Sequence, residues 1–231
     1  MNISELIAFE NETIVALNKP HGLLVHKSAI ARDAKEFALQ WVRDYCGCKV
    51  HLAHRLDRKT SGVLLFAKTE EENSYLQTLF RDKQMLKVYK AIVRGYTNDI
   101  GVIDYALTND REIVQEALTR YSTLSQYEIP LETMAHLTSR YSLVQLMPET
   151  GRYHQLRKHM AHIRHPIIGD RPHGCNKQNK LWKEQFQMTT MLLHAESIEF
   201  THKDYGLINI IAPMSKVFKD TLDMLTRSSI G

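Results

Sequence analysis

Apolar residues recur along the chain in runs and alternations that predict short strands. Residues 7–9 and 13–18 form two such segments joined by a polar turn. Residues 63–67 are an unbroken apolar run, typical of a strand buried on both faces, whereas residues 87–95 alternate as a half-buried strand does. Further strand candidates are residues 102–105, 117–121, 141–146, 191–195 and 207–211.

Helical periodicity occurs between these strand candidates. Asp33 can cap a first helix, with Glu36 at capping-box spacing and Gly47 as its stop. Aromatic residues recur every four positions in this helix, which predicts a core-facing stripe: Phe37, Trp41 and Tyr45.

Three more helices follow from the same signals. Thr69 and Glu72 form a second capping box, ahead of an inward stripe made of Tyr75, Leu76, Leu79 and Phe80. Thr150 is the predicted cap of a helix that Pro166 ends, with its apolar face at Leu156, Met160 and Ile163. Residues 215–225 are predicted to form a closing helix, and residues 132–139 a surface loop.

These elements predict an α+β fold. Strands that follow one another through short turns favour antiparallel pairing, so we expect a mixed, mostly antiparallel sheet flanked by helices. A chain of 231 residues with 43% hydrophobic residues can bury a core without disulfides or metals. We expect the three cysteines to be reduced. The length allows one large domain or two small ones, and we expect residues 1–231 to form one domain.

Composition and charge narrow the class of protein. No basic leader precedes an apolar run at the N-terminus, and no segment approaches the roughly 18 apolar residues of a membrane span, so we expect a cytoplasmic protein without membrane contact. The formal net charge of +4 suits a polyanionic partner. Residues 152–165 hold four Lys or Arg residues and four histidines, which predicts a helix that contacts phosphates. A solvated charged face is the alternative interpretation, and it is the one we favour for Lys158 and Arg164.

Residues 54–62 carry the first candidate for chemistry. They place one carboxylate, Asp57, between Arg55 and Arg58 on a polar loop directly before the apolar run at 63–67. A loop anchored to a strand holds a reactive side chain rigidly, and the flanking charges favour the ionised carboxylate, so Asp57 is a candidate base or nucleophile. A solvated surface ion pair is the alternative interpretation.

Two segments resemble the signatures of one enzyme family. The His-Arg-Leu-Asp motif at 54–57, followed by Thr-Ser-Gly at 60–62, resembles the catalytic motif of the RluA-type pseudouridine synthases, which isomerise uridine to pseudouridine in RNA. Residues 150–159 are similar to the family's second block, Thr-Gly-Arg-x-His-Gln-(Ile/Leu)-Arg. The resemblance extends from about residue 7 to about residue 213, and it implies a pseudouridine synthase fold with the active-site cleft across the sheet and no N-terminal S4 domain.

The resemblance implies a set of site residues. Asp57 would be the essential catalytic residue, Tyr89 would stack on the target base, and Arg157 would hold Asp57 ionised. Arg55 would take part in extruding the uridine from the RNA stem. The remaining substrate-binding candidates are Arg152, His154 and Lys158, with Leu193 packing under the active-site tyrosine. Core packing alone would also explain Tyr89 and Leu193, and a plain turn would explain the Lys-Pro-x-Gly loop at 19–22, which the family shares.

A zinc site is an alternative use of the histidines at 159, 162 and 165, with Cys175 or His173 downstream. Successive steps of three precess around a helix, no glutamate stands where a metallohydrolase helix would place its base, and the family uses no metal. Isomerisation involves no net redox change or hydrolysis, so we expect neither metal nor cofactor.

Residues 165–174 bear on the choice of RNA. Most ribosomal-RNA-modifying relatives have Tyr where His173 stands, so this segment favours the tRNA-modifying branch, for which the expected target is uridine 65 in the T-stem. The same chemistry on 23S ribosomal RNA is one alternative, and a catalytically silent RNA-binding protein or tRNA chaperone is another. We expect the enzyme to be a monomer.

Overall fold

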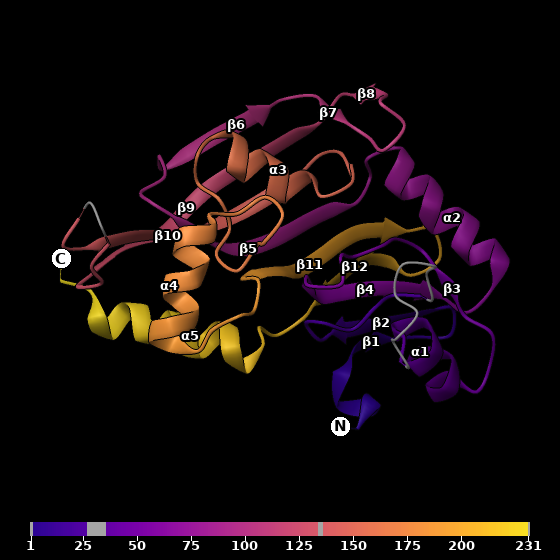
Figure 1. Ribbon diagram of the computed structural model, residues 1–231. Coiled ribbons are helices and arrows are strands. Elements are labelled where there is room, and N and C mark those ends of the chain that lie inside the picture. Colours follow the sequence, from indigo (N-terminus) through magenta and orange to yellow (C-terminus); the bar gives the residue numbers. More distant parts are fainter. Residues whose placement is uncertain (1, 27–35, 134–135, 231) are drawn as a thin grey trace. The chain divides into compact units, whose positions relative to one another are not determined.

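The computed structural model describes residues 2–26, 36–133 and 136–230 (Figure 1). Contacts between residues divide the chain into two compact units, each made of two separate stretches. Unit 1 contains Met1–Lys87 and Ala195–Met214, and unit 2 contains Val88–His194 and Ser215–Gly231. The expected single domain over residues 1–231 stays a prediction.

Unit 1 is built on an antiparallel strand meander. Strand β2 pairs antiparallel with β1 on one side and with β4 on the other, while β4 also pairs with the short β3 and lies next to β11, which pairs with β12. The strands are β1 (Ile7–Glu10), β2 (Ile14–Lys19), β3 (His51–Leu52), β4 (Ser61–Ala67), most of β11 (Leu193–His202) and β12 (Gly206–Ile211). The strands predicted at 7–9, 13–18, 63–67 and 207–211 are confirmed, whereas β11 extends seven residues beyond the predicted end.

The helices of unit 1 are η1 (Ile3–Leu6), α1 (Ala38–Cys46) and α2 (Glu70–Arg81). The capping box of α2 is confirmed, because the Thr69 side chain accepts a hydrogen bond from the Glu72 amide at 3.1 Å. Helix α1 begins later than predicted, at Ala38, and ends at Gly47 in the left-handed conformation as expected. The predicted cap at Asp33 lies outside the described residues.

The aromatic stripe of α1 packs less deeply than the sequence predicts. The fully buried side chains of this helix are Ala38 and Val42. Phe37, Trp41 and Tyr45 are only half-buried beside them. The small side chains let the helix approach β2, and this close approach leaves the large rings at the edges of the contact.

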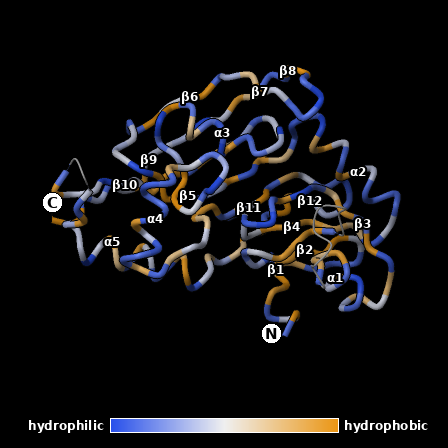
Figure 2. Tube along the Cα trace, in the orientation of Figure 1, coloured by the Kyte–Doolittle hydropathy of each residue, from blue (hydrophilic) through white to orange (hydrophobic). Residues whose placement is uncertain are grey.

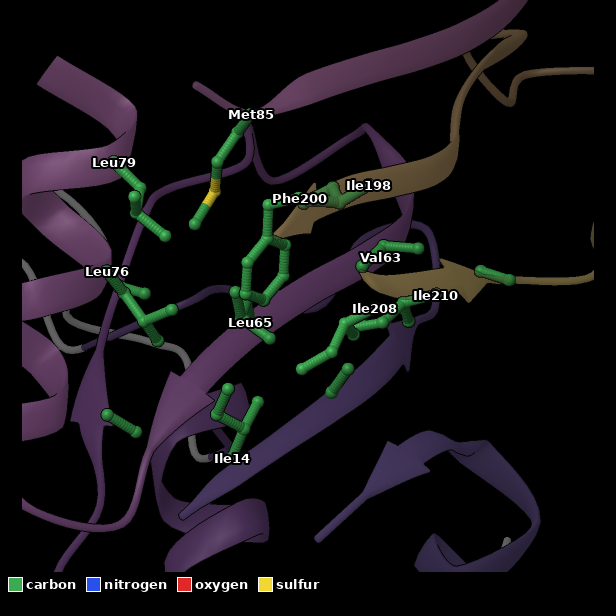
Figure 3. Packing of buried hydrophobic residues seen from close by; sticks show 14 residues of the cluster. Ile14, Val63, Leu65, Leu76, Leu79, Met85, Ile198, Phe200, Ile208 and Ile210 are labelled. Atoms are coloured by element: carbon green, nitrogen blue, oxygen red, sulfur yellow. The ribbon is translucent and has the colours of Figure 1, made fainter. Parts of the chain in front are cut away.

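The main core of unit 1 lies between α2 and the strands (Figure 3). Leu76 and Leu79 of α2 pack on alternate residues of the strands, which therefore share one face of the sheet. The labelled strand residues are Ile14, Val63, Leu65, Ile198, Phe200, Ile208 and Ile210, joined by Met85. Every residue of β4 is buried, and the apolar residues 63–67 give most of this strand the hydrophobic colour in Figure 2.

Unit 2 contains a second antiparallel series in the order β5-β10-β9-β6, together with the hairpin β7-β8. Its strands are most of β5 (Leu86–Arg94), β6 (Ile100–Asp104), β7 (Leu107–Thr108), β8 (Val114–Gln115), β9 (Leu118–Ile129) and β10 (Ser139–Pro148). The strands predicted at 87–95, 102–105, 117–121 and 141–146 are confirmed, although β9 is longer than expected. The loop predicted at 132–139 lies partly outside the described residues.

The helices of unit 2 are α3 (Gln155–His162), α4 (Asn176–Phe186) and α5 (Lys216–Ser228) (Figure 1). Helix α5 has the expected cap, because Ser215 accepts a hydrogen bond from the Phe218 amide at 3.3 Å. Helix α4 was not predicted, since only Gln178 and Trp182 of its residues are fully buried and its apolar pattern is weak.

The predicted cap of α3 is wrong. Thr150 does not cap the helix, because its hydroxyl bonds the Gln155 side chain at 2.7 Å and accepts the Leu118 amide at 3.1 Å. The helix begins at Gln155 instead, directly after His154 in the left-handed conformation. It also ends at His162, four residues before Pro166. Arg164, between the helix end and Pro166, has a positive φ of 65°.

The pairing within both units confirms the α+β prediction and its largely antiparallel strands. None of the helices among the described residues has the length and apolar character that a membrane crossing requires.

Candidate active site

Asp57 stands on the turn that leads into β4. The Thr60 amide donates to the Asp57 carbonyl at 3.1 Å, and Leu56 beside it is buried, so the turn is closed on itself and anchored in the core. Asp57 itself is half-buried, whereas Arg55 and Arg58 are exposed. The structure therefore places Asp57 on a loop directly before a buried strand, as the sequence predicts.

His54 fixes the same loop to the sheet. The backbone pairing of β3 with β4 continues through the Ala53 amide, which donates to the Leu65 carbonyl at 3.1 Å. At the next step the His54 Nε2 atom accepts from the Leu65 amide at 3.1 Å, so an imidazole takes the place of a backbone carbonyl. This bond requires the neutral ring. Burial, together with the nearby Lys87 ammonium, lowers the pKa of His54 to about 4.

Lys19 ties a second loop to the one that carries Asp57. Its ammonium is fully buried and donates to the carbonyls of Pro20, Leu23 and Arg58 at 3.1, 3.0 and 3.1 Å. Three acceptors match the three N–H donors of an ammonium. Burial lowers the pKa of Lys19 to about 7, while the negative charge of Asp57 raises it. Sequence reasoning left this residue open between a functional loop and a plain turn.

A glycine is required where the catalytic motif enters β4. Gly62 has a φ of +107°, and a Cβ atom there would lie 2.0 Å from the Ala195 carbonyl oxygen of β11. No side chain fits in that space. The Thr-Ser-Gly part of the motif is thus explained by the close approach of β4 and β11.

Tyr89 and Leu193 lie in one hydrophobic cluster of unit 2. Leu193 belongs to the buried part of this cluster and is 3% exposed. Tyr89 of β5 is half-buried and packs against the cluster. Leu156 and Met160, from the inner face of α3, belong to the same cluster. Both residues thus belong to one cluster, and the packing of Leu193 under Tyr89 that the resemblance implies stays a prediction, since burial in a core would also explain both residues.

Arg157 forms a buried ion pair that sequence reasoning missed. Its Nε and Nη2 atoms each lie 2.8 Å from a carboxylate oxygen of Asp170, and both residues are at most 5% exposed. Burial acts to raise the pKa of Asp170, but the bonds and charge of Arg157 outweigh it and lower the pKa overall. A guanidinium has five N–H donors, so this pair does not exhaust the donors of Arg157.

The other basic residues of this segment divide into buried and accessible ones. His159 was expected on the polar side of the helix, but it is fully buried, with Nδ1 at 3.0 Å from the Thr119 hydroxyl and Nε2 at 3.0 Å from the Tyr105 carbonyl. Burial lowers its pKa even though the Tyr105 carbonyl acts to raise it. Nδ1 thus joins the helix to β9, and Nε2 joins it to Tyr105, which directly follows β6.

The three predicted RNA-binding residues lie at the start of α3. Arg152 is half-buried and donates through Nε to the Glu116 carbonyl at 3.0 Å. His154 Nδ1 lies 2.9 Å from Nε2 of His173, and the Lys158 ammonium lies 3.4 Å from the Thr108 carbonyl. Arg152 and His154 thus directly precede α3, and Lys158 lies in its first turn.

Gln155 explains why this end of α3 is well defined. Its amide group donates to the Leu118 carbonyl and the Thr119 hydroxyl, both at 3.0 Å. Its Oε1 atom accepts from Thr150 at 2.7 Å and from the Arg152 amide at 3.0 Å. One buried amide thus joins the Thr-Gly-Arg turn, the helix start and β9.

Comparison with known proteins agrees with this assignment of motifs. A family model described as RNA pseudouridylate synthase matches residues 13–162. A relative from Vibrio vulnificus, called tRNA pseudouridine synthase C, is 44% identical over 207 residues, which cover 85% of this chain and 84% of the relative. A protein of the same name from Yersinia pestis is 44% identical over 211 residues, with 87% and 82% covered.

Solved structures give the same fold. The human RNA pseudouridylate synthase domain containing 4 protein superposes with a TM-score of 0.75 at 26% identity, covering 97% of this chain and 94% of the human one. The human domain containing 1 protein, at 19% identity and a TM-score of 0.71, shares the fold. The chain therefore belongs to the RNA pseudouridylate synthase family and is an isomerase that acts on RNA.

Proposed function

We propose that this enzyme converts uridine to pseudouridine in tRNA, at position 65 of the T-stem. The observation that carries the choice of tRNA is the 44% identity, over most of both chains, to relatives called tRNA pseudouridine synthase C. Such an enzyme acts where tRNA is modified, in the cytoplasm, and we expect it to act as a monomer. The reaction breaks the glycosidic bond, turns the base and rejoins it through carbon 5, without net redox change or hydrolysis.

We propose Asp57 as the catalytic carboxylate. Its support is the motif in which it lies and the construction of its loop, which the Thr60 turn, His54 and Lys19 all hold in place. Several independent bonds on one short loop restrict where the carboxylate can stand, and such restriction is what catalysis by positioning requires.

The other proposed roles follow the resemblance. Tyr89 would stack on the target base, with Leu193 packing beneath it, and Arg157 would support the charge of the catalytic carboxylate. Arg55, which is exposed on the Asp57 loop, would assist extrusion of the uridine. Arg152, His154 and Lys158 would contact the RNA.

The test is release of tritium from RNA labelled at carbon 5 of uridine. Carbon 5 enters the new bond in pseudouridine, so each turnover must release its label. We expect release from bulk tRNA and none from 23S ribosomal RNA, and we expect Asp57→Ala to abolish release while RNA affinity stays within a few-fold. Asp204→Ala, which changes an exposed aspartate of unit 1, is the matched control and should keep full activity.

Each other outcome contradicts part of the proposal. Release from ribosomal RNA alone would exclude the tRNA assignment but keep the reaction. Retained activity in Asp57→Ala would exclude the catalytic residue. Release from neither RNA by the unaltered enzyme would contradict the proposed function as a whole.

A further inference from the structure

Tyr153 is an exposed aromatic residue inside the basic motif at the start of α3. Its side chain is 55% exposed, the largest exposure among the tyrosines described as exposed. One face of its ring stacks on His154, with the ring centroids 3.7 Å apart and the planes 22° apart. The Lys158 ammonium lies over the tyrosine ring in a cation–π contact, 5.6 Å from the ring centroid.

The imidazole beneath Tyr153 is held from two directions. The backbone of His154 is left-handed, with a φ of 56°, which sets the direction in which the side chain leaves the chain. Its Nδ1 atom is 2.9 Å from Nε2 of His173, and the two rings meet edge to face at a centroid distance of 5.1 Å. In such a bond one nitrogen donates and the other accepts, so the contact restrains the position of the His154 ring and couples its tautomer to that of His173.

His173 is itself held by a constrained loop. Its amide donates to Oδ1 of the buried Asp170 at 3.3 Å. Asn179 accepts from the Gly169 amide at 2.9 Å and donates to the Asp170 carbonyl at 2.7 Å, which clamps the loop from α4. Gly174 passes so close that a Cβ atom would lie 1.9 Å from the Asp170 carbonyl. A continuous series of contacts thus connects the buried Asp170 through His173 and His154 to the exposed ring of Tyr153.

We propose that Tyr153 is a stacking platform for a nucleobase of the RNA substrate, held in place by His154 and His173. An exposed tyrosine ordinarily loses side-chain entropy when a ligand orders it, and a ring already stacked on a fixed imidazole has less to lose. Bases of single-stranded or distorted RNA stack readily on aromatic side chains. The nearby Lys158 ammonium supplies the cation that an RNA backbone phosphate requires.

The test compares RNA affinity across variants of one ring, and it rests on the proposed function only for the choice of tRNA as the probe. Tyr153→Leu should weaken the binding of bulk tRNA about five- to a hundredfold, because stacking on the base is lost. Tyr153→Phe should bind within about twofold of the unaltered enzyme, since the stacking surface remains. The matched control is Tyr205→Leu, because Tyr205 is also exposed and its ring also lies against a histidine, His202, at a centroid distance of 4.8 Å.

Salt dependence separates stacking from charge. Tyr153→Leu should leave the slope of log affinity against log salt unchanged, whereas Lys158→Ala should reduce its magnitude by about one. Unchanged affinity in Tyr153→Leu, or an equal loss in Tyr205→Leu, would overturn the platform. Tritium release by the unaltered enzyme decides the proposed function separately, because it does not depend on the affinity ratio.

Discussion

At the scale of single residues, the loop that carries Asp57 is held by side chains that form hydrogen bonds with backbone groups. Lys19 donates hydrogen bonds to three carbonyls from two loops, and His54 accepts a hydrogen bond from a backbone amide of β4. Neither side chain needs to meet the RNA for the loop to depend on it. Polar residues that look like functional groups in the sequence therefore include some, such as His54 and Lys19, that hold the loop around the Asp57 carboxylate in place.

The neutral state of His54 predicts a pH dependence of stability. Its pKa in the folded protein is about 4, below the usual value of 6.5, so between these values the unfolded chain binds a proton that the folded protein does not. The contribution of His54 to stability is complete above pH 6.5 and is lost as the pH falls towards 4. This loss should amount to about 3 kcal/mol.

Urea unfolding of the protein and of His54→Gln between pH 7 and 4.5 measures this contribution. The glutamine amide can still accept from the Leu65 amide but does not titrate in this range. The stability of the unaltered protein should therefore fall more steeply with decreasing pH than that of the variant. Parallel profiles would contradict the assignment of a neutral, hydrogen-bonded His54.

The Arg157–Asp170 pair gives a prediction of its own. In Asp170→Asn the guanidinium keeps its charge in a buried site but loses the opposing carboxylate, which should cost about 3 kcal/mol of unfolding free energy and greatly slow tritium release. Asp220→Asn, which breaks the exposed pair with Lys216, should change stability by less than about 1 kcal/mol. Similar losses of unfolding free energy in the two variants, measured by urea unfolding, would show that the buried pair stabilises the protein no more than the exposed one.

Site residues were predictable from the sequence only as far as motifs identify them. The loop that carries Asp57 could be placed because a polar motif runs directly into an unbroken apolar strand. The partner of Arg157 could not, because Asp170 lies 13 positions away beyond the end of α3 and no spacing rule connects them. Burial of His159 was missed for a similar reason, since its partners are Thr119 of β9 and Tyr105, which directly follows β6.

At the scale of elements, strands β4 and β11 approach each other so closely at Gly62 that no side chain fits between them. Gly62→Ala would place a methyl group 2.0 Å from the Ala195 carbonyl, in a backbone conformation that alanine disfavours. The strands must separate or bend, so we expect a loss of at least about 3 kcal/mol or failure to fold. Gly151→Ala, where no atom lies within 4 Å of the added methyl group, should stay within about 1 kcal/mol in the same urea titration.

Elements with a deep apolar face were predictable, and those without one were not. Strands β1, β2, β4 and β12 of unit 1, together with helix α5, carry regular apolar positions and were predicted close to their observed bounds, and the start of helix α2 was predicted from its capping box. Helix α4 buries only Gln178 and Trp182 fully, so its sequence resembles a polar loop. The start of α3 was misplaced because a threonine that could cap a helix is used instead to bond a glutamine side chain.

At the scale of the whole molecule, the sequence indicated the class of fold and the direction of strand pairing but not the division of the chain. Short turns between strands imply antiparallel neighbours, which both units contain. The return of residues 195–214 to unit 1, and of residues 215–231 to unit 2, has no local signal. Such long-range pairing is decided by complementary surfaces, and periodicity does not report these.

The interleaved course of the chain has a consequence during synthesis. Unit 1 draws Ile198, Phe200, Ile208 and Ile210 of its main core from a stretch that follows the whole first part of unit 2. At typical rates of translation, residues 1–87 must wait on the order of ten seconds for these partners to be made. During synthesis the hydrophobic face of the first strands of unit 1 therefore stays exposed to solvent until the last quarter of the chain has been made. We expect ribosome-associated chaperones to bind the nascent chain during this interval.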